Sequence, residues 1–249
     1  MSNSHFPQIL VLLLGLLIPH SPLPAYDSIV LTTENDSNQP TIQGNKSLLD
    51  HAVTPASTFK MVLCWAGLET GLVTPSSKSL VTDQYVPGTP RKLALTEAMF
   101  YSSNDYFVQL AKRWPESELN AWVNRSHFFA TPLPSNWLSK GFSSLTHTAT
   151  TTAQQEHKFI LRVMRHQLTQ RTEIDRQLWE CLAWPSSGST WKVYGKTGSA
   201  TDVFWFNGFG ISKDHQRAVT VLFTGKDASR NLAIAEFYRQ FDLSAPNQP

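Results

Sequence analysis

Hydrophobic residues change their spacing in the last third of the chain, where short runs bounded by turns are typical of β-strands. Three such runs, at 191–197, 203–210 and 218–224, are joined by short connections, which predict an antiparallel meander. Near the N-terminus, a β-branched run at 28–33 is followed by a polar turn and a second short run at 40–42. We expect this hairpin and the meander to form one sheet.

The segment between these strands has the hydrophobic spacing of helices. One helix begins at Thr54, which fits an N-cap, and Pro55, which suits the first helical position. Gly71 fits the left-handed end of this helix, and its residues are apolar nearly all round, so we expect it to be buried. Further helices are predicted at 96–114, 152–170, 172–182 and 231–241, with irregular loops at 75–90 and 130–139.

Strands at both ends of the chain with helices between them predict an α+β architecture. The chain has 249 residues, 41% of them hydrophobic, which is enough for one sizeable domain. Because no internal repeat or long linker divides them, residues 26–249 are expected to form a single domain.

The first 25 residues differ from the rest. A Leu-rich apolar run at 9–18 is too short for a comfortable transmembrane span, and Pro19 ends it. Leu23-Pro24-Ala25 follows as a small-residue cleavage site, so residues 1–25 are interpreted as a secretory signal peptide, with an uncleaved anchor as the alternative. The mature protein is then expected to be periplasmic or secreted, without stable membrane insertion.

Charge and cysteine content narrow the range of partners. The net charge is +2 and the Lys and Arg residues are scattered, which gives no reason to expect nucleic acid binding. No group of His, Cys, Asp and Glu has metal-ligand spacing, so no metal site is predicted. Cys64 and Cys181 could pair in an exported chain, but Cys64 is interpreted first as a small buried hydrophobe, and the pairing stays open.

Ser57 and Lys60 lie three residues apart at the start of the first predicted helix, so both side chains share one face. A serine hydroxyl is a poor nucleophile without a base, and a buried lysine can lose its proton because desolvation disfavours the charged form. The pair therefore predicts an activated nucleophile and its base. A helix-capping serine is the plain alternative, and Ser189-x-x-Lys192 repeats the spacing by accident.

A second polar element, Ser102-Ser103-Asn104, lies on the next predicted helix. If the helix is irregular there, the Ser102 hydroxyl and the Asn104 amide would project into a cleft near Lys60. They would then relay protons and hold the lysine. The plain alternative is a polar helix surface.

A third element, Lys196-Thr197-Gly198, lies on a predicted strand. Lys196 offers a cation and Thr197 a hydroxyl to a substrate carboxylate, and Gly198 lets a ligand approach the backbone closely. Backbone N–H groups of this strand and of Ser57 would together form an oxyanion hole. An ordinary strand with an exposed lysine is the alternative.

These elements occur in the order Ser-x-x-Lys, Ser-x-Asn, Lys-Thr-Gly, the set found in β-lactamases and penicillin-binding proteins. The chain resembles the penicillin-recognising serine acyl enzymes, and most of all the class D β-lactamases, over residues 28–241. The resemblance implies a two-part fold, an antiparallel β-sheet flanked by the terminal helices beside an all-helical region. It rests on Pro55-Ala56-Ser57-Thr58-Phe59-Lys60, Gly67-Leu68-Glu69-Thr70-Gly71, Ala98-Met99, Gln109-Leu110-Ala111-Lys112-Arg113, Trp137-Leu138, Lys196-Thr197-Gly198, Trp205-Phe206-Asn207-Gly208 and Arg230.

The resemblance also implies roles for single residues. Lys60 would carry a carbamate derived from CO₂, which acts as general base for acylation and deacylation, with no other cofactor. Ser102 would relay protons, Trp137 would steady the carbamylated lysine, and Arg230 would bind the substrate carboxylate. The implied function is that of a class D serine β-lactamase, which hydrolyses β-lactam antibiotics through a Ser57 acyl-enzyme.

Three departures from class D keep other functions open. Asn104 stands where those enzymes usually have an aliphatic residue, and it matches the Ser-x-Asn of penicillin-binding transpeptidases. The Tyr-Gly-Asn motif is absent, with 122–124 as a loose match, and the signal peptide runs almost directly into the first strand. The alternatives are a DD-transpeptidase or carboxypeptidase acting on peptidoglycan stem peptides, and a β-lactam sensor that stays acylated.

Overall fold

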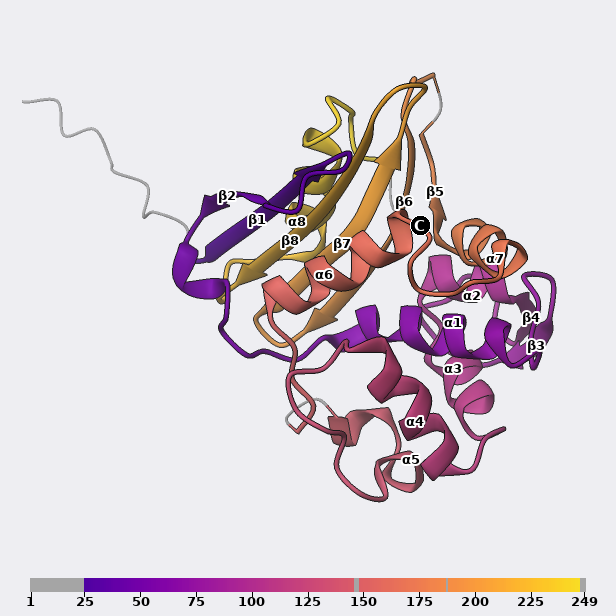
Figure 1. Cartoon of the computed structure of the whole chain (residues 1–249). Helices are drawn as coiled ribbons and strands as arrows, with labels where there is room; N and C mark the ends of the chain where they lie inside the picture. The colour runs from indigo at the N-terminus through magenta and orange to yellow at the C-terminus, as the bar shows by residue number, and fades with distance from the viewer. Residues whose placement is uncertain (1–24, 146–147, 187, 247–249) are drawn as a thin grey trace, which may run out of the picture.

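The computed structural model describes residues 25–145, 148–186 and 188–246 (Figure 1). The predicted signal peptide, apart from Ala25, lies outside the described residues. Within the described ranges, six strands form one antiparallel sheet in the order β2-β1-β8-β7-β6-β5. Their bounds are β1 (Asp27–Glu34), β2 (Thr41–Gly44), β5 (Ala183–Trp184), β6 (Lys192–Ala200), β7 (Val203–Ile211) and β8 (Gln216–Thr224).

The N-terminal hairpin and the C-terminal meander meet in this sheet, as the sequence predicts. β1 pairs with β8 along its whole length, and β8, β7 and β6 follow one another as neighbours. Residues directly opposite each other on paired strands point to the same face. A row of polar side chains, Lys196, Asn207 and Thr220, therefore crosses the sheet on one face.

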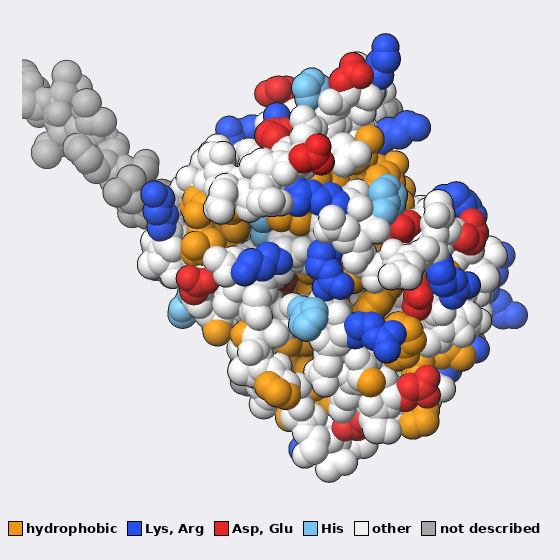
Figure 2. Space-filling model, viewed as in Figure 1, with side chains coloured by type: hydrophobic (Ala, Val, Ile, Leu, Met, Phe, Trp, Pro, Cys, Tyr) orange, Lys and Arg blue, Asp and Glu red, His pale blue; other side chains and the backbone are white. Residues whose placement is uncertain are grey.

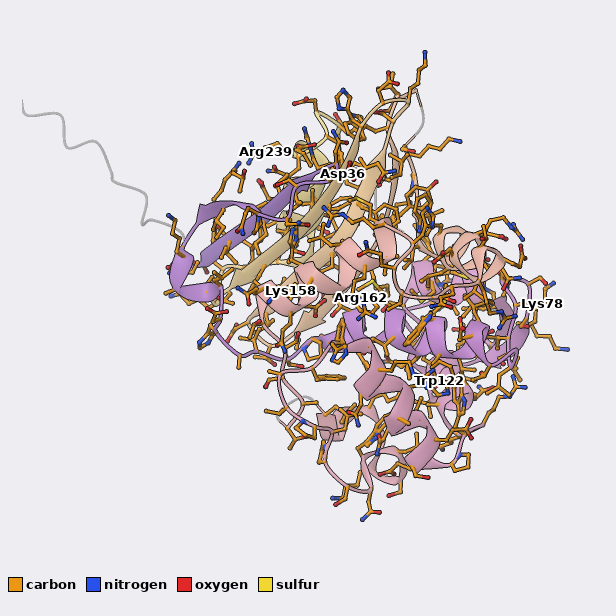
Figure 3. All side chains as sticks on the ribbon, in the orientation of Figure 1. Asp36, Lys78, Trp122, Lys158, Arg162 and Arg239 are labelled. Atoms are coloured by element: carbon orange, nitrogen blue, oxygen red, sulfur yellow. The ribbon has the colours of Figure 1, made fainter. Side chains whose placement is uncertain are left out.

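Two helices cover the opposite faces of the sheet. In Figure 1, α6 (Ala153–Met164) lies in front of the sheet and α8 (Arg230–Arg239) lies behind it. The predicted core residues Phe159 and Ile160 of α6 are buried, whereas Lys158, labelled in Figure 3, is exposed. The α+β class is thus confirmed, but α6 comes from the middle of the chain, so only one of the two flanking helices is terminal.

The helical region lies beside the sheet and surrounds α1 (Lys60–Glu69), which is buried from Lys60 to Leu68 (Figure 1). Gly71 follows α1 with φ 71°, as expected of a left-handed stop. A 3₁₀ turn, η2 (Ala56–Phe59), precedes α1, so the α-helix begins later than the sequence predicts. The other helices here are α2 (Leu95–Tyr101), α3 (Asn104–Ala111), α4 (Glu116–Ser126), α5 (Trp137–Lys140) and α7 (Thr172–Leu182), with the short 3₁₀ turn η3 (Phe142–Leu145). Another 3₁₀ turn, η1 (Lys46–Leu48), contacts β1 of the sheet instead.

Two predictions about this region are wrong in detail. The single helix predicted at 96–114 is two helices, because Ser102 adopts a left-handed conformation with φ 61° and Ser103 then caps α3. The predicted loop at 75–90 contains β3 (Lys78–Val81), which pairs with β4 (Arg91–Ala94). The helical region therefore includes one small hairpin among its described residues.

Both cysteines are free and buried, Cys64 on α1 and Cys181 on α7. Burial raises the pKa of the Cys64 thiol well above its ordinary value, and a hydrogen bond with Cys181 adds to the shift. The two thiols are therefore neighbours between packed helices.

The charge distribution on the surface and the lengths of the helices indicate which kinds of partner the protein can have. In Figure 2 acidic and basic side chains are interspersed over this face, and hydrophobic side chains reach the surface in separate small patches. Among the described helices, none has the length and apolar composition that crossing a membrane requires. No group of three or more His, Cys, Asp and Glu residues in the described segments could hold a metal ion.

Candidate active site

Ser57 lies in the η2 turn, between the start of α1 and strand β6. The turn is held by Thr58 N, which donates to Pro55 O at 3.1 Å. Ala56 has φ 49°, a left-handed conformation that costs an alanine roughly 1–2 kcal/mol. Such strain beside a nucleophile persists only where surrounding contacts over-determine it.

Gly198 explains how closely the turn approaches the sheet. A Cβ atom at this position would lie 2.6 Å from Pro55 O and 3.0 Å from a methyl carbon of Thr58. The predicted close approach at Gly198 is therefore made by the nucleophile turn itself. This packing places Ser57 directly over β6.

Four oxygen atoms of described residues surround the Lys60 amine. Its Nζ lies 2.6 Å from both Ser102 O and Asn104 Oδ1, and 3.2 Å from Ser102 Oγ. It also lies 3.0 Å from Ser57 Oγ. The two nearest atoms are carbonyl-type oxygens, which can only accept, so both N–H bonds of a neutral amine satisfy them. The remaining lone pair is then free to accept the proton of Ser57.

The pKa of Lys60 is lowered to about 7, chiefly by burial; the anion of Asp83 raises it and the cation of Arg230 lowers it, each by a smaller amount. The side chain is only 3% exposed. A substantial fraction of Lys60 is therefore unprotonated at neutral pH, as a general base requires.

The break between α2 and α3 aims Ser102 and Asn104 at the lysine. Asp83 holds this break by accepting hydrogen bonds from Ser103 Oγ and from Asn104 N, the latter at 3.1 Å. The Tyr85 hydroxyl accepts from Asn104 N at 2.9 Å and donates to Ser102 O at 3.1 Å. Sequence reasoning missed Asp83 and Tyr85, because they lie in a polar loop that gives no periodic signal.

Two cavities of the described structure meet at Ser57. One, of about 330 Å³, is lined by Ser57, Ser102, Thr197 and Arg230 among others. The other, of about 230 Å³, is more apolar, and its remaining lining includes Lys60 and Asn104 together with Phe129, Phe142 and Leu145. A substrate reacting at Ser57 could therefore extend in two directions, one polar and cationic, the other aromatic.

Thr197 and Arg230, two of the three predicted carboxylate-binding residues, line the cationic cavity. Arg230 Nε donates to Thr197 Oγ1 at 3.3 Å, and Lys196 Nζ donates to Thr197 O at 3.0 Å. Lys196 is fully buried, and burial, followed by the cations of Lys60 and Arg230, lowers its pKa well below the ordinary value. Arg230 lines this cavity and attracts an anion there, whereas the fully buried Lys196 is not among the described residues that line it.

Trp137 differs from its expected placement. Its indole N–H donates to Asn120 Oδ1 at 2.8 Å, so this donor is not the one that steadies a group on Lys60. The ring is buried and packs against Phe59 and Phe142, at centroid distances of 5.9 and 6.2 Å. Trp137 thus supports the wall of the apolar cavity from behind.

The second Ser-x-x-Lys sequence has no comparable surroundings among the described residues. The Ser189 hydroxyl accepts a hydrogen bond from Trp191 N at 2.9 Å, within a turn before β6. Lys192 is exposed at the start of that strand. The interpretation of this repeat as an accident agrees with its position on the surface.

Comparisons with known proteins were made for sequence and for fold. The sequence profile of the penicillin binding protein transpeptidase domain matches residues 26–155. A search of curated proteins finds no match to the chain. Solved class D β-lactamases share the fold, at a sequence identity of 17% to 21% in three of them.

Three of these structures illustrate the likeness. The BAT-2 delta mutant, a class D β-lactamase, has a TM-score of 0.77 at 21% identity, covering 89% of this chain and 94% of its own. A class D β-lactamase from Bacillus subtilis has a TM-score of 0.75 at 18% identity, covering 88% and 92%. The class D protein YbXI from Nostoc has a TM-score of 0.75 at 17% identity, covering 88% and 95%.

Proposed function

The chain belongs to the penicillin-binding protein transpeptidase domain family, and on this premise we propose that it is a serine β-lactamase, acylated by β-lactams at Ser57. The observation that carries the proposal is the Lys60 amine, 3.0 Å from Ser57 Oγ with two carbonyl-type oxygens taking its N–H bonds. An amine held in this way is a ready proton acceptor for the serine hydroxyl.

Acylation then follows from the arrangement around Ser57. Ser57 Oγ attacks the lactam carbonyl carbon while Lys60 takes its proton, and the backbone N–H groups of Ser57 and of β6 stabilise the oxyanion. When the C–N bond of the lactam breaks, the nitrogen needs a proton. Ser102 Oγ, which lies 3.2 Å from the amine, would pass this proton from Lys60 to the nitrogen.

The two cavities give the substrate its orientation. The carboxylate next to the lactam nitrogen would bind Thr197 and Arg230 in the cationic cavity. The acyl side chain on the other side of the reacting carbonyl would then lie in the apolar cavity, against Phe129 and Phe142. Hydrolysis of the acyl-enzyme completes the reaction when Lys60, unprotonated again, activates a water molecule.

The base itself has a second candidate, the carbamate on Lys60 that the class D resemblance implies. A carbamylated lysine keeps one N–H where a neutral amine has two. Either Ser102 O or Asn104 Oδ1, both 2.6 Å from Nζ, would then lose its donor on the lysine. We therefore propose the free amine as the base.

Replacing Asn104 with valine should make β-lactam hydrolysis respond to added bicarbonate, whereas hydrolysis by the wild type should not respond. Valine removes the amide oxygen and leaves apolar surface beside the amine, surroundings that keep it neutral for carbamylation. The measurement is hydrolysis of a chromogenic cephalosporin with and without bicarbonate at one pH, with Asn104→Gln as the control. Bicarbonate activation of the wild type would replace the free amine with the carbamate.

The second candidate function is that of a DD-transpeptidase or carboxypeptidase acting on peptidoglycan stem peptides. It is favoured by the bond from Lys60 to Asn104 Oδ1, since Asn104 completes the Ser-x-Asn pattern of those enzymes. A sensor that stays acylated shares the same first step. Export to the periplasm or the medium, through the predicted signal peptide at 1–25, would suit all three.

The lifetime of the acyl-enzyme separates these functions. Intact mass spectrometry after mixing with penicillin should show an adduct that forms and decays over repeated turnovers, as a β-lactamase requires. A long-lived adduct, together with release of D-alanine from a stem-peptide analogue, would instead identify a carboxypeptidase. A long-lived adduct without that release would identify a sensor, and in both cases the proposal of hydrolysis fails.

A further inference from the structure

Directly behind the nucleophile turn, a buried carboxyl group has neutral side chains as its hydrogen-bond partners. Glu156 projects from α6 towards the sheet and is completely buried. One of its oxygens accepts from Asn207 Nδ2 on β7, and the other, Oε1, lies 2.6 Å from Thr58 Oγ1. Thr58 is the residue that follows Ser57, so Glu156 reaches the nucleophile turn from the side opposite to the substrate.

The hydrogen atoms available to these contacts decide the state of the carboxyl group. The Thr58 hydroxyl has one hydrogen but two oxygens within reach, Pro55 O at 2.7 Å and Glu156 Oε1 at 2.6 Å. If Glu156 were ionised, it would have no hydrogen to give, and one of these two contacts would join bare oxygens. A proton on Oε1 resolves both contacts, because Glu156 then donates to Thr58 and Thr58 donates to Pro55.

We propose that Glu156 is a neutral carboxylic acid whose proton is donated to Thr58, and that it positions the turn carrying Ser57. The chain of donors runs from Asn207 through Glu156 and Thr58 to the carbonyl of Pro55. That carbonyl precedes Ala56, the residue held at φ 49°, and packs against Gly198. Each bond in such a chain strengthens the next, so the carboxyl group fixes the strained turn from behind.

The charged groups nearby leave the acid neutral. Burial raises the pKa of Glu156 well above its ordinary value, and the opposing contributions come from the hydrogen bonds with Thr58 and Asn207, both uncharged. The adjacent His157 bonds Thr33 and Thr220 instead, and burial lowers its pKa to about 3, so it is uncharged. Lys196, on the same sheet face, directs its amine to Thr197 O.

This inference rests on the proposed function only for its catalytic consequence, so its first test needs no β-lactam. The infrared difference spectrum between wild type and Glu156→Gln at neutral pH should contain the carbonyl stretch of a protonated carboxylic acid. A carboxylate band in its place would overturn the proposal, whether or not Ser57 reacts with penicillin.

Thermal unfolding gives a second test of the same point. An unfolded glutamate loses its proton near pH 4.5, whereas the folded Glu156 retains it to higher pH, so the contribution of Glu156 to the stability of the wild type falls as pH rises above 4.5. The glutamine of the Glu156→Gln variant cannot ionise. The unfolding temperature of this variant minus that of the wild type should therefore rise across this range, and a flat or falling difference would contradict a neutral acid.

The positioning role is tested by acylation with a fluorescent penicillin. Glu156→Ala should slow acylation roughly 10- to 100-fold through misplacement of Ser57, and Glu156→Gln should restore it, because glutamine can donate to Thr58 and accept from Asn207. Lys158→Ala, two residues along α6 and exposed in Figure 3, is the matched control and should react like wild type. Equal rates in the alanine and glutamine variants would refute positioning by hydrogen bonds.

Discussion

Replacing Lys60 with alanine should slow acylation of Ser57 by a fluorescent penicillin roughly 100- to 10,000-fold, the range that general base catalysis contributes. The reason is that the amine 3.0 Å from Ser57 Oγ is the proton acceptor in the attack. Stopped-flow labelling at pH 8 measures the effect. Lys60→Met should be equally slow while keeping the bulk of the side chain in the core.

The second Ser-x-x-Lys sequence supplies a matched control for this experiment. Lys192 has the same spacing from Ser189 that Lys60 has from Ser57, but it is exposed. Lys192→Ala should therefore acylate at the wild-type rate. If the Lys60 variants retain the wild-type rate while folded, as judged by their thermal unfolding, then Lys60 is not the base.

Acylation should also fall about tenfold for each pH unit below about 7, because only the unprotonated amine accepts a proton. Burial lowers the pKa of Lys60 to about 7, so roughly one site in a hundred retains the neutral amine at pH 5. The measurement is the second-order acylation rate constant between pH 5 and 9. A carbamate is also lost in acid, so the pH profile is measured again with bicarbonate. The fall in the acylation rate below about pH 7, the acid limb of the profile, should then stay in place.

A matched variant checks the assignment of this acid limb. Asp83 is the anion that raises the pKa of Lys60, so Asp83→Asn should move the limb to lower pH while keeping much of the hydrogen bonding to Ser103. An acylation rate that is constant from pH 5 to 8 in the wild type would contradict Lys60 as a base with this pKa.

Much of the fold is predictable because its strands and helices follow hydrophobic spacing. The meander, the N-terminal hairpin and the helix at 172–182 all appear as expected, since short apolar runs between turns predict strands buried on both faces and one-face burial gives a helix its period. The hairpin and the meander also join in one sheet as expected, but the hydrophobic pattern does not indicate that β1 and β8 are the strands that pair.

The break at Ser102 is the clearest limit of such reasoning. The hydrophobic spacing of a helix continues across 96–114, yet Ser102 adopts a left-handed conformation that no pattern in the sequence predicts. The break depends on Asp83 and Tyr85, which lie about twenty residues away in a segment that looks like a plain loop. Long-range polar contacts of this kind decide how Ser102 and Asn104 face Lys60.

Glu156 was missed for a related reason. A glutamate on an amphipathic helix is expected on its exposed side, because an unpaired buried charge is costly. Only the three-dimensional contact with Thr58 and Asn207 reveals that it lies in the core. For Trp137 the resemblance predicted too much. It implied an indole N–H that steadies a group on Lys60, whereas this N–H donates to Asn120.

The central claim is that Ser57 is the residue that β-lactams acylate, and peptide mapping tests it most directly. After brief exposure of the native protein to benzylpenicillin, the account predicts a gain of one whole penicillin mass, located on Ser57 and absent in Ser57→Ala. The whole mass is retained because opening the lactam ring releases no leaving group. A native protein that neither gains an adduct nor consumes benzylpenicillin, or that gains one on another residue that persists in Ser57→Ala, would contradict it.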